Sequence, residues 1–212
     1  MATFVIITLE GKISLRNIMK QAVVFLAVFL GSLLANDTLQ VDIDNSQITW
    51  LGRKVTGEHT GILNISNGWV VMDNNTLVSG KFIFDMTSIS NMDIESPEWK
   101  QKLEDHLKSE DFFYVDSFPR AILKIKGTQA VPGEKSASKK RALADLTIRG
   151  IAHEISFPFI LNQDENHFIA SGTVNVDRTL YNIQYQSGKF IENLGDKLIY
   201  DDFTVQFIVQ TE

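Results

Sequence analysis

The 212-residue chain contains no cysteine, which excludes disulfide bonds, thiolate metal sites, cysteine nucleophiles and lipid attachment at an N-terminal cysteine. Basic residues are in the minority, with 20 Lys and Arg against 26 Asp and Glu and a formal net charge of −6. A chain with this balance has no basic surplus to neutralise phosphates, so we expect no nucleic-acid partner. Its length and its 44% of hydrophobic residues nevertheless suffice for a sizeable globular core.

Motifs that carry catalysis or bind cofactors are also missing from the sequence. Its four histidines, His59, His106, His153 and His167, are scattered and show no metal-ligand spacing. There is no GxSxG nucleophile elbow, no glycine-rich phosphate loop and no GxGxxG fingerprint. We therefore expect no metal site, no cofactor and no catalytic residues.

The apolar run at residues 22–35 has 14 residues, fewer than the roughly 20 that a membrane-spanning helix needs. Met19 and Lys20 stand just before this run, and an alanine ends it. A positive start, a short apolar segment and a small residue are typical of a secretory signal peptide. We expect residues 1–35 to be a cleaved signal peptide, with Met19 as the true start and residues 1–18 as an upstream extension. The alternative is a buried core helix or an uncleaved anchor.

From Leu39 onward, apolar residues alternate with polar ones at a period of two. The alternation is clearest at residues 142–148, 155–161, 168–176 and 203–209. Such alternation predicts half-buried antiparallel strands rather than the continuous apolar runs of a parallel sheet. The predicted strands cover residues 40–44, 46–55, 59–66, 69–73, 77–88, 118–128, 141–161 with a bend at Gly150, 167–177 and 198–210.

Turn and loop signals separate these strands. Asn67-Gly68 and the stretch 73–75 predict tight turns, and residues 163–166 predict another. Residues 129–140 are polar and rich in Pro, Gly, Ser and Lys, which predicts an exposed loop. About eight evenly spaced strands, joined in this way, predict an all-β barrel or sandwich.

One helix interrupts the pattern of strands. Ser96-Pro97 supplies an N-cap residue and a proline suited to the first helical position. Trp99, Leu103 and Leu107 then recur every four residues and form an apolar stripe. We expect this stripe to lie on the barrel.

Aromatic residues are numerous, with 14 Phe and 3 Trp, and several of them cluster. Phe82 and Phe84 lie on one predicted strand, and Phe112, Phe113 and Phe118 lie close together after the helix. Two interpretations stay open at this point. The aromatic side chains either fill a packed core or line a cavity for an apolar ligand.

Four motifs occur in order between Leu39 and the C-terminus and resemble those of the YceI-like family. They are HLKSEDFF (106–113), SFP (117–119), LTIRG (146–150) and VDRT (176–179). The opening VDIDNS at residues 41–46 also fits, except that Asn45 stands where the family often has histidine. The lysine-rich stretch 134–140 is a further departure, in a region that varies among members.

The resemblance implies a lipocalin-like antiparallel β-barrel over residues 36–212, with about eight strands and one α-helix packed on its side. In this family an elongated apolar tunnel binds a long-chain isoprenoid, such as a polyprenyl carrier or the tail of a quinone, or another long amphiphile. The resemblance therefore implies non-enzymatic carriage or storage of such a lipid by a periplasmic or secreted protein. A homodimer is left open.

Strand parity and the motifs together suggest which residues contact the ligand. The expected tunnel residues are Trp50, Leu63, Ile65, Phe82, Phe84, Met86, Phe112, Phe113, Leu123, Ile125, Phe157, Phe159, Val205 and Phe207. The expected head-group residues, polar and beside the matched motifs, are Lys54, His59, Arg178 and Tyr185. For Arg178 the alternative is a buried structural ion pair.

Two other functions stay open. The first is a structural or partner-binding envelope protein whose barrel is fully packed. The second is an enzyme acting on an apolar substrate, which would need a positioned acid–base or nucleophile pair that the sequence does not show.

We predict that export removes residues 1–35, because the short apolar run after Met19-Lys20 ends in a small residue. N-terminal sequencing of protein from the cell envelope should find Asn36 as the first residue. A mature chain that begins at Met1 or Met19 would refute this prediction.

Overall fold

The computed structural model describes residues 36–212, with gaps at residues 132, 134–135, 137 and 165–166. The predicted signal peptide, residues 1–35, lies outside the described residues. Within the described part, no helix has both the length and the apolar character needed to cross a bilayer.

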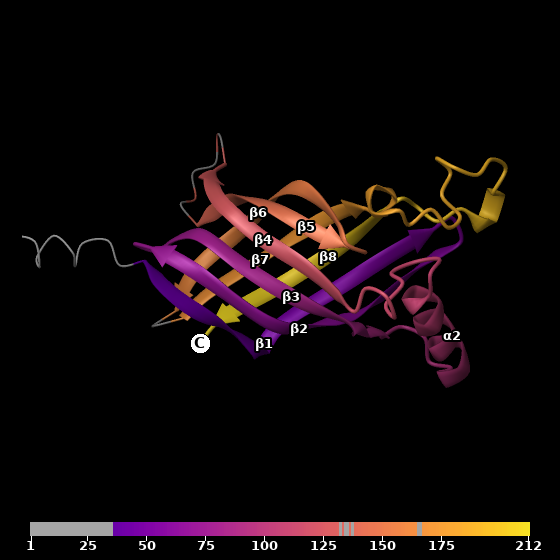
Figure 1. Cartoon of the computed structure of the whole chain (residues 1–212), viewed down its shortest axis with the longest axis horizontal. Helices are drawn as coiled ribbons and strands as arrows, with labels where there is room; N and C mark the ends of the chain where they lie inside the picture. Colours follow the sequence, from indigo (N-terminus) through magenta and orange to yellow (C-terminus); the bar gives the residue numbers. More distant parts are fainter. Residues whose placement is uncertain (1–35, 132, 134–135, 137, 165–166) are drawn as a thin grey trace, which may run out of the picture. The chain divides into compact units, whose positions relative to one another are not determined.

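Eight antiparallel strands form a closed barrel, because β1 pairs with β2 on one side and with β8 on the other (Figure 1). The strands are β1 (Asp37–Lys54), β2 (Gly57–Asp73), β3 (Thr76–Asn91), β4 (Arg120–Ala130), β5 (Lys139–Ile148), β6 (Ile151–Asp164), β7 (His167–Asp177) and β8 (Asp202–Thr211). Each strand pairs with its neighbours in sequence, so the order around the barrel is the order along the chain. The predicted all-β barrel is confirmed.

The turn predicted at Asn67-Gly68 is wrong, and the two segments around it form the single strand β2. Asn67 pairs with Ile83 of β3, and Gly68 pairs with Phe82. A Cβ on Gly68 would lie 2.8 Å from a methyl group of Val41, so this glycine serves close packing across the barrel wall. The preference of Asn-Gly for a turn is overridden here, because a neighbouring side chain occupies the space that a Cβ at the glycine would need.

The segments 40–44 and 46–55 likewise form one strand, β1, which carries a bulge between Asp42 and Gln47. The Asp42 carboxylate accepts hydrogen bonds from the backbone N–H and the side-chain amide of Asn45, at 3.1 and 2.7 Å. The Ser46 hydroxyl donates to the Asp42 carbonyl at 2.6 Å. These local bonds hold the extra residues of the bulge in place.

The predicted long strand 141–161 is instead a hairpin of β5 and β6. Arg149 and Gly150 form its turn with φ angles of 50° and 73°. Two successive positive φ angles are the mark of the two-residue turn that joins twisted antiparallel strands. A residue predicted to bend one strand therefore reverses the chain.

The helix α2 (Pro97–Lys108) follows its predicted N-cap, but only the later part of its apolar stripe faces the barrel. Trp99 is 58% exposed, whereas Leu107 reaches the barrel interior. Four residues turn a helix by about 400°, so each step of the stripe drifts by about 40° and Trp99 lies about 80° around the helix from Leu107. The Glu104 carboxylate accepts from the Asn91 backbone N–H at 2.7 Å, which attaches α2 to the end of β3.

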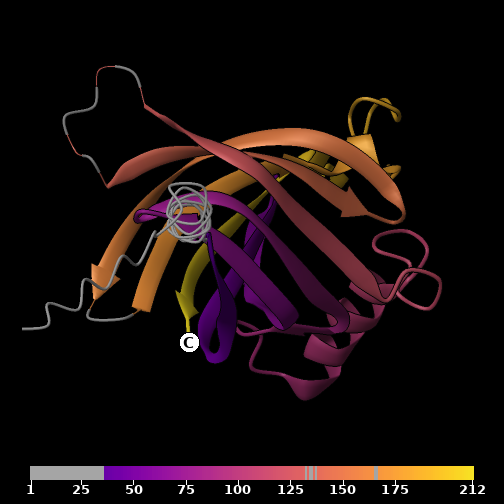
Figure 2. The ribbon, with the colours of Figure 1, turned by 60° about the vertical axis from the view of Figure 1, so that its left-hand side comes forward.

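The connections at the two ends of the barrel differ in length (Figures 1 and 2). One end, called here the α2 end, carries the connection 92–119 with α2 and the connection 178–201, called here the strap. The strap contains two short 3₁₀ helices, η1 (Arg178–Tyr181) and η2 (Gly195–Lys197). The opposite end carries the β2–β3, β4–β5 and β6–β7 connections and the C-terminus.

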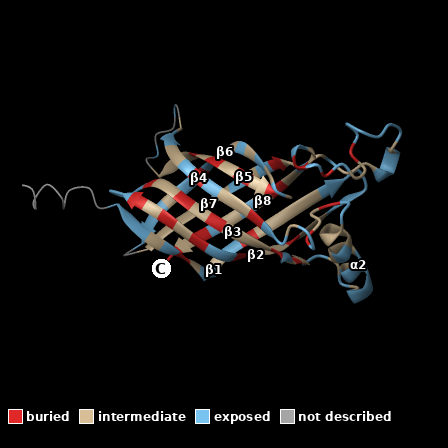
Figure 3. Cartoon of the chain, in the orientation of Figure 1, coloured by how far each residue is buried: buried red, intermediate tan, exposed pale blue. Residues whose placement is uncertain are grey.

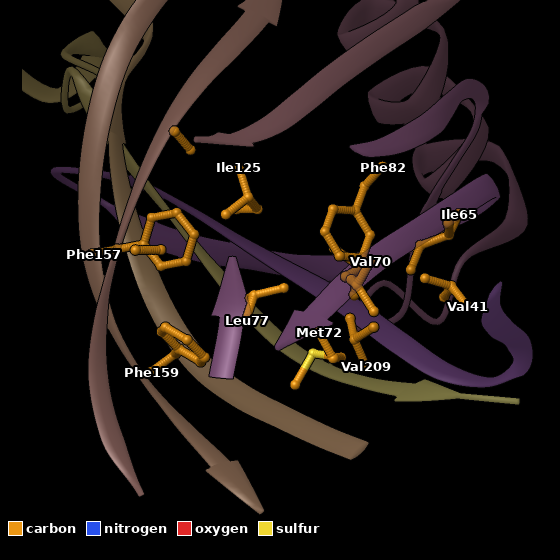
Figure 4. Close-up of a cluster of buried hydrophobic side chains, with 13 residues drawn as sticks. Val41, Ile65, Val70, Met72, Leu77, Phe82, Ile125, Phe157, Phe159 and Val209 are labelled. Atoms are coloured by element: carbon orange, nitrogen blue, oxygen red, sulfur yellow. The ribbon is translucent and has the colours of Figure 1, made fainter. Parts of the chain in front are cut away.

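Buried and exposed positions alternate along the strands (Figure 3), and the buried side chains form two clusters. The first cluster, which includes Met72, Leu77, Phe159 and Val209, fills the end opposite α2 (Figure 4). The second cluster includes residues of both long connections. Its members are Met86, Ile89, Phe112, Val115, Ala121, Leu146, Ile148, Val176, Tyr181 and Ile183. The interior is therefore sealed at one end and shaped by loops at the other.

The predicted loop 129–140 is shorter than expected, because Gln129 pairs with Arg141 and Ala130 with Lys140 as part of β4 and β5. Replacing residues 131–137 by two glycines should leave the thermal midpoint nearly unchanged, since this stretch lies outside the strands. Extending the deletion into residues 129–130 should lower the midpoint, because it removes ladder pairs. A drop of more than about 10 °C for the short deletion, measured by circular dichroism, would contradict the prediction.

Candidate ligand-binding site

One apolar cavity of about 220 Å³ lies inside the barrel and is lined by side chains from all eight strands and from α2. An engineered cavity of about 150 Å³ lined by Leu, Ile and Phe stays dry and binds small apolar molecules in another protein. The larger cavity here is lined mostly by the same residue types, so it offers an apolar ligand more room and little attraction for water.

The structure places all of the predicted tunnel residues except Ile65 around this cavity. Phe157 and Phe207 meet there edge to face, with ring centroids 5.8 Å apart. Ile65 is buried in the same cluster as Val41 and Phe82 but does not border the cavity (Figure 4). Ile65 thus faces inward as the predicted parity requires, but its side chain packs within the buried cluster instead of bordering the cavity.

Several cavity-lining residues were missed by the sequence analysis. Most of those on strands follow the same alternation as the predicted ones and could have been included: Ile48, Ala121, Ala142, Leu146, Ile148, Ile155, Ala170, Val174, Val176, Phe203 and Val209. Leu77 and Ile89 lie out of step with the predicted β3 residues, because the β2–β3 register shifts near each of them. Ile183, Ile199 and Tyr200 belong to the strap. No periodicity marks the strap residues, because their positions depend on how an irregular segment folds over the barrel.

The two ends of the cavity differ in polarity. At the end opposite α2 its lining consists of buried apolar residues such as Leu77, Phe159 and Val209. At the α2 end the lining includes Arg53 and Tyr200, both exposed to solvent. The polar lining residues Arg53, Arg178, Tyr200 and Asp202 all lie at this end, and we call them the mouth. An apolar interior with a single polar opening suits an amphiphile whose apolar chain enters first.

Of the predicted head-group residues, Lys54, His59 and Tyr185 do not line the cavity. The Lys54 side chain is exposed at the end of β1. The Nδ1 atom of His59 lies 2.8 Å from the Asp93 carboxylate. Tyr185 packs edge to face on His106, with ring centroids 4.7 Å apart. These three residues are close to the matched motifs in sequence but do not lie at the mouth. His59 and Tyr185 contact local partners instead, and Lys54 points into solvent.

Arg178 does border the cavity, and it is 3% exposed. Its Nε donates to the Tyr200 carbonyl at 3.1 Å, while Nη1 and Nη2 donate to the carbonyls of Ile183 and Ile199 at 3.0 Å each. The Asp201 carboxylate lies 3.7 Å away. Burial lowers the pKa of Arg178, and the nearby carboxylates oppose this effect. Its donors thus hold both halves of the strap, as the structural interpretation of this residue requires.

A second contact fixes the base of the strap. The Lys189 ammonium donates to the Asp177 carboxylate at 2.6 Å and lies 3.6 Å from Asp201. Burial raises the pKa of Asp177, but hydrogen bonds from Lys189 and Thr179 outweigh this effect and hold the pKa below its usual value. Lys189 is half exposed, so solvent weakens this contact relative to the Arg178 bonds.

Similarity to known proteins extends over most of the chain. The family model for the YceI-like domain matches residues 39–211. The structure is similar to BcnA from Burkholderia cenocepacia (TM-score 0.65, 17% identity, covering 81% of this chain and 99% of that one). It is also similar to a polyisoprenoid binding domain from Saccharophagus degradans (0.58, 13%, 84% and 99%) and to the Campylobacter jejuni YceI protein (0.51, 16%, 71% and 84%). No curated protein sequence matches the chain.

We predict that Arg178→Met lowers the free energy of unfolding by about 3 kcal/mol, because it leaves strap carbonyls and the Asp201 carboxylate without their buried partner. Lys189→Met is the matched control and should cost much less, since its contact is exposed to solvent. Both values come from urea denaturation. Equal losses for the two variants would show that Arg178 does not hold the strap.

Proposed function

The chain belongs to the YceI-like domain family, and from the cavity inside its barrel we propose that it binds and carries a long apolar chain with a polar head, such as an isoprenoid lipid. The observation that carries this proposal is the one-sided polarity of the cavity. Its deep end is apolar, and its polar groups gather at the mouth. A ligand with the same division of polarity would bury its chain and leave its head near solvent.

Burial of the ligand chain supplies the binding energy in this proposal. Each 100 Å² of apolar ligand surface removed from water contributes roughly 2.5 kcal/mol. No hydrogen bonds to the chain itself are needed, and the lining offers none in the deep part of the cavity. Polar contacts at the mouth would fix only the orientation of the ligand.

An isoprenoid is favoured among amphiphiles by the relatives. The similar domain from Saccharophagus degradans is described as polyisoprenoid binding, and it shares the fold at 13% identity. Branched methyl groups along an isoprenoid chain match a lining of Ile, Val, Leu and Phe side chains, which present an uneven apolar surface. The proposal includes export to the periplasm or beyond, with residues 1–35 as the signal.

The cavity lining also bears on the two alternative functions. A fully packed barrel would leave no cavity of about 220 Å³, so the structure favours ligand binding over a purely structural role. Among the described lining residues there is no serine, threonine or histidine. Asp202 is the one carboxylate in the described lining, and the Tyr200 phenol is the one hydroxyl there. This composition favours binding over acid–base or nucleophilic catalysis.

We predict that Ala142→Phe abolishes lipid binding without unfolding the barrel. Ala142 is buried and lines the cavity, so the added ring would occupy the space of the ligand. Ala152→Phe is the matched control, because Ala152 is exposed on β6. Native mass spectrometry of protein purified from the cell envelope should find lipid on the wild type and on the control only.

A second cavity-filling variant guards against overpacking. Ala170→Leu adds less volume at another lining position and should reduce the lipid occupancy as well. Thermal midpoints of all variants should show that each is folded. Lipid retained at the wild-type level by both filled variants would place the ligand elsewhere, and a wild type that never carries lipid would end the proposed function.

A further inference from the structure

Large apolar side chains stand exposed around the α2 end of the barrel. Six of them, each about half exposed, form what we call the apolar rim: Val55, Met92, Trp99, Phe190, Ile191 and Tyr200. Other exposed apolar side chains, such as Ile43 and Ile208, lie on barrel strands instead. Contiguous exposed apolar patches are uncommon on monomeric proteins and mark interaction sites.

The rim comes from three connections that the fold brings together at this end (Figure 1). Val55 lies in the β1–β2 turn, and its N–H donates to the carbonyl of Leu198 in the strap at 3.1 Å. Met92 and Trp99 belong to the connection that carries α2, and Met92 N–H donates to the Thr60 carbonyl at 2.9 Å. Hydrogen bonds to the barrel or to neighbouring loops thus anchor the turn, the strap and the start of the α2 connection.

The rim is continuous with the ligand cavity. Tyr200 belongs to both, because its side chain lines the mouth and is half exposed. Its N–H donates to the Arg53 carbonyl at 3.0 Å, which attaches it to another mouth residue. Phe190 and Ile191 project from the same strap, where their N–H groups donate to the Ser187 carbonyl at 3.2 and 3.0 Å. An apolar chain leaving the cavity would therefore pass next to exposed apolar side chains.

We propose that the apolar rim docks the mouth of the barrel on the surface of a lipid bilayer, so that the ligand chain passes between membrane and cavity without crossing water. This inference rests on the proposed function, because a ligand with negligible solubility in water requires a contact route. Exposed apolar side chains at the α2 end, among them the amphipathic rings of Trp99 and Tyr200, suit the boundary between headgroups and acyl chains.

The charge around the rim indicates which bilayer it fits. Charged residues of both signs lie beside the rim: Glu98 and Lys100 flank Trp99, and the Lys102 ammonium lies 4.8 Å from the centre of its ring. Lys189 and Glu192 flank Phe190 and Ile191. The whole chain is acidic, with a net charge of −6. Because charges of both signs lie beside the rim and the whole chain is acidic, docking relies on apolar burial in a zwitterionic surface and depends little on salt.

The test compares two double variants with matched exposure. Phe190→Ser with Ile191→Ser removes side chains that are 51% and 46% exposed at the rim. Ile208→Ser with Ile43→Ser removes side chains with the same exposures, 51% and 46%, on the barrel strands. Since all four positions are on the surface, both double variants should keep the wild-type thermal midpoint.

Two measurements on phosphatidylcholine vesicles follow. In flotation, the rim variant should partition onto vesicles at least about tenfold less than the wild type, since it loses two of the side chains that would insert. In stopped-flow transfer of a dansyl-labelled geranylgeraniol, the wild-type rate should rise in proportion to vesicle concentration, and the rim variant should be slower by a similar factor. The strand variant should match the wild type in both.

Equal flotation and transfer by the two double variants would overturn docking, as would a transfer rate independent of vesicle concentration. Binding only to anionic vesicles would also overturn docking on a zwitterionic surface. A wild-type dimer that dissociates in the rim variant alone would overturn it too, because the rim would then bind another copy of the chain. If the wild type binds no labelled isoprenoid and carries no lipid, the proposed function fails. Flotation measures only the binding of the protein to vesicles, so it cannot give this result. The two failures are therefore distinguishable.

Discussion

The pairing of β1 with β8 is the constraint on which the cavity depends. It closes the sheet, so that the backbone groups of the first and last strands have partners and no edge is left between them. Closure also directs every second side chain of each strand toward a single interior. A barrel of eight strands has an interior about as wide as its side chains, or one ligand, can fill. The size of the lining residues then decides how much of that space stays empty.

The asymmetry of the cavity follows from antiparallel order combined with unequal connections. In an eight-stranded meander, connections alternate between the two ends, so the β3–β4 and β7–β8 connections must lie at the same end. These two, residues 92–119 and the strap, are the long ones. Their side chains, such as Phe112 and Ile183, shape the opening, whereas short turns leave the other end to the packed cluster around Leu77 and Phe159. One topological fact thus separates a sealed end from an open one.

The sequence predicted what depends on strand parity and failed where a local contact overrides it. Alternation located Phe157 and Phe207 in the cavity wall, because a strand in a closed barrel has only two faces. It also predicted that Ile65 faces inward, but parity could not show that this side chain packs within the core instead of bordering the cavity. Asn67-Gly68 was predicted as a turn because nothing near it in sequence shows that Val41 packs against Gly68. The polar residues of the mouth were hardest to predict, because the strap that contributes Arg178 and Tyr200 has no period.

The strap joins stability and function in a single buried group. The Arg178 guanidinium donates to the backbone carbonyls of Ile183 and Tyr200 in the strap. Tyr200 in turn belongs to both the mouth and the rim. A ligand head at the mouth would compete for a guanidinium whose donors already serve the backbone. Loss of ligand in a variant of Arg178 would therefore report a displaced strap as readily as a lost contact. Arg53 and Asp202 line the same mouth, are exposed and hold no strap carbonyl through their side chains in the described structure, so they are the residues at which head-group recognition can be separated from folding.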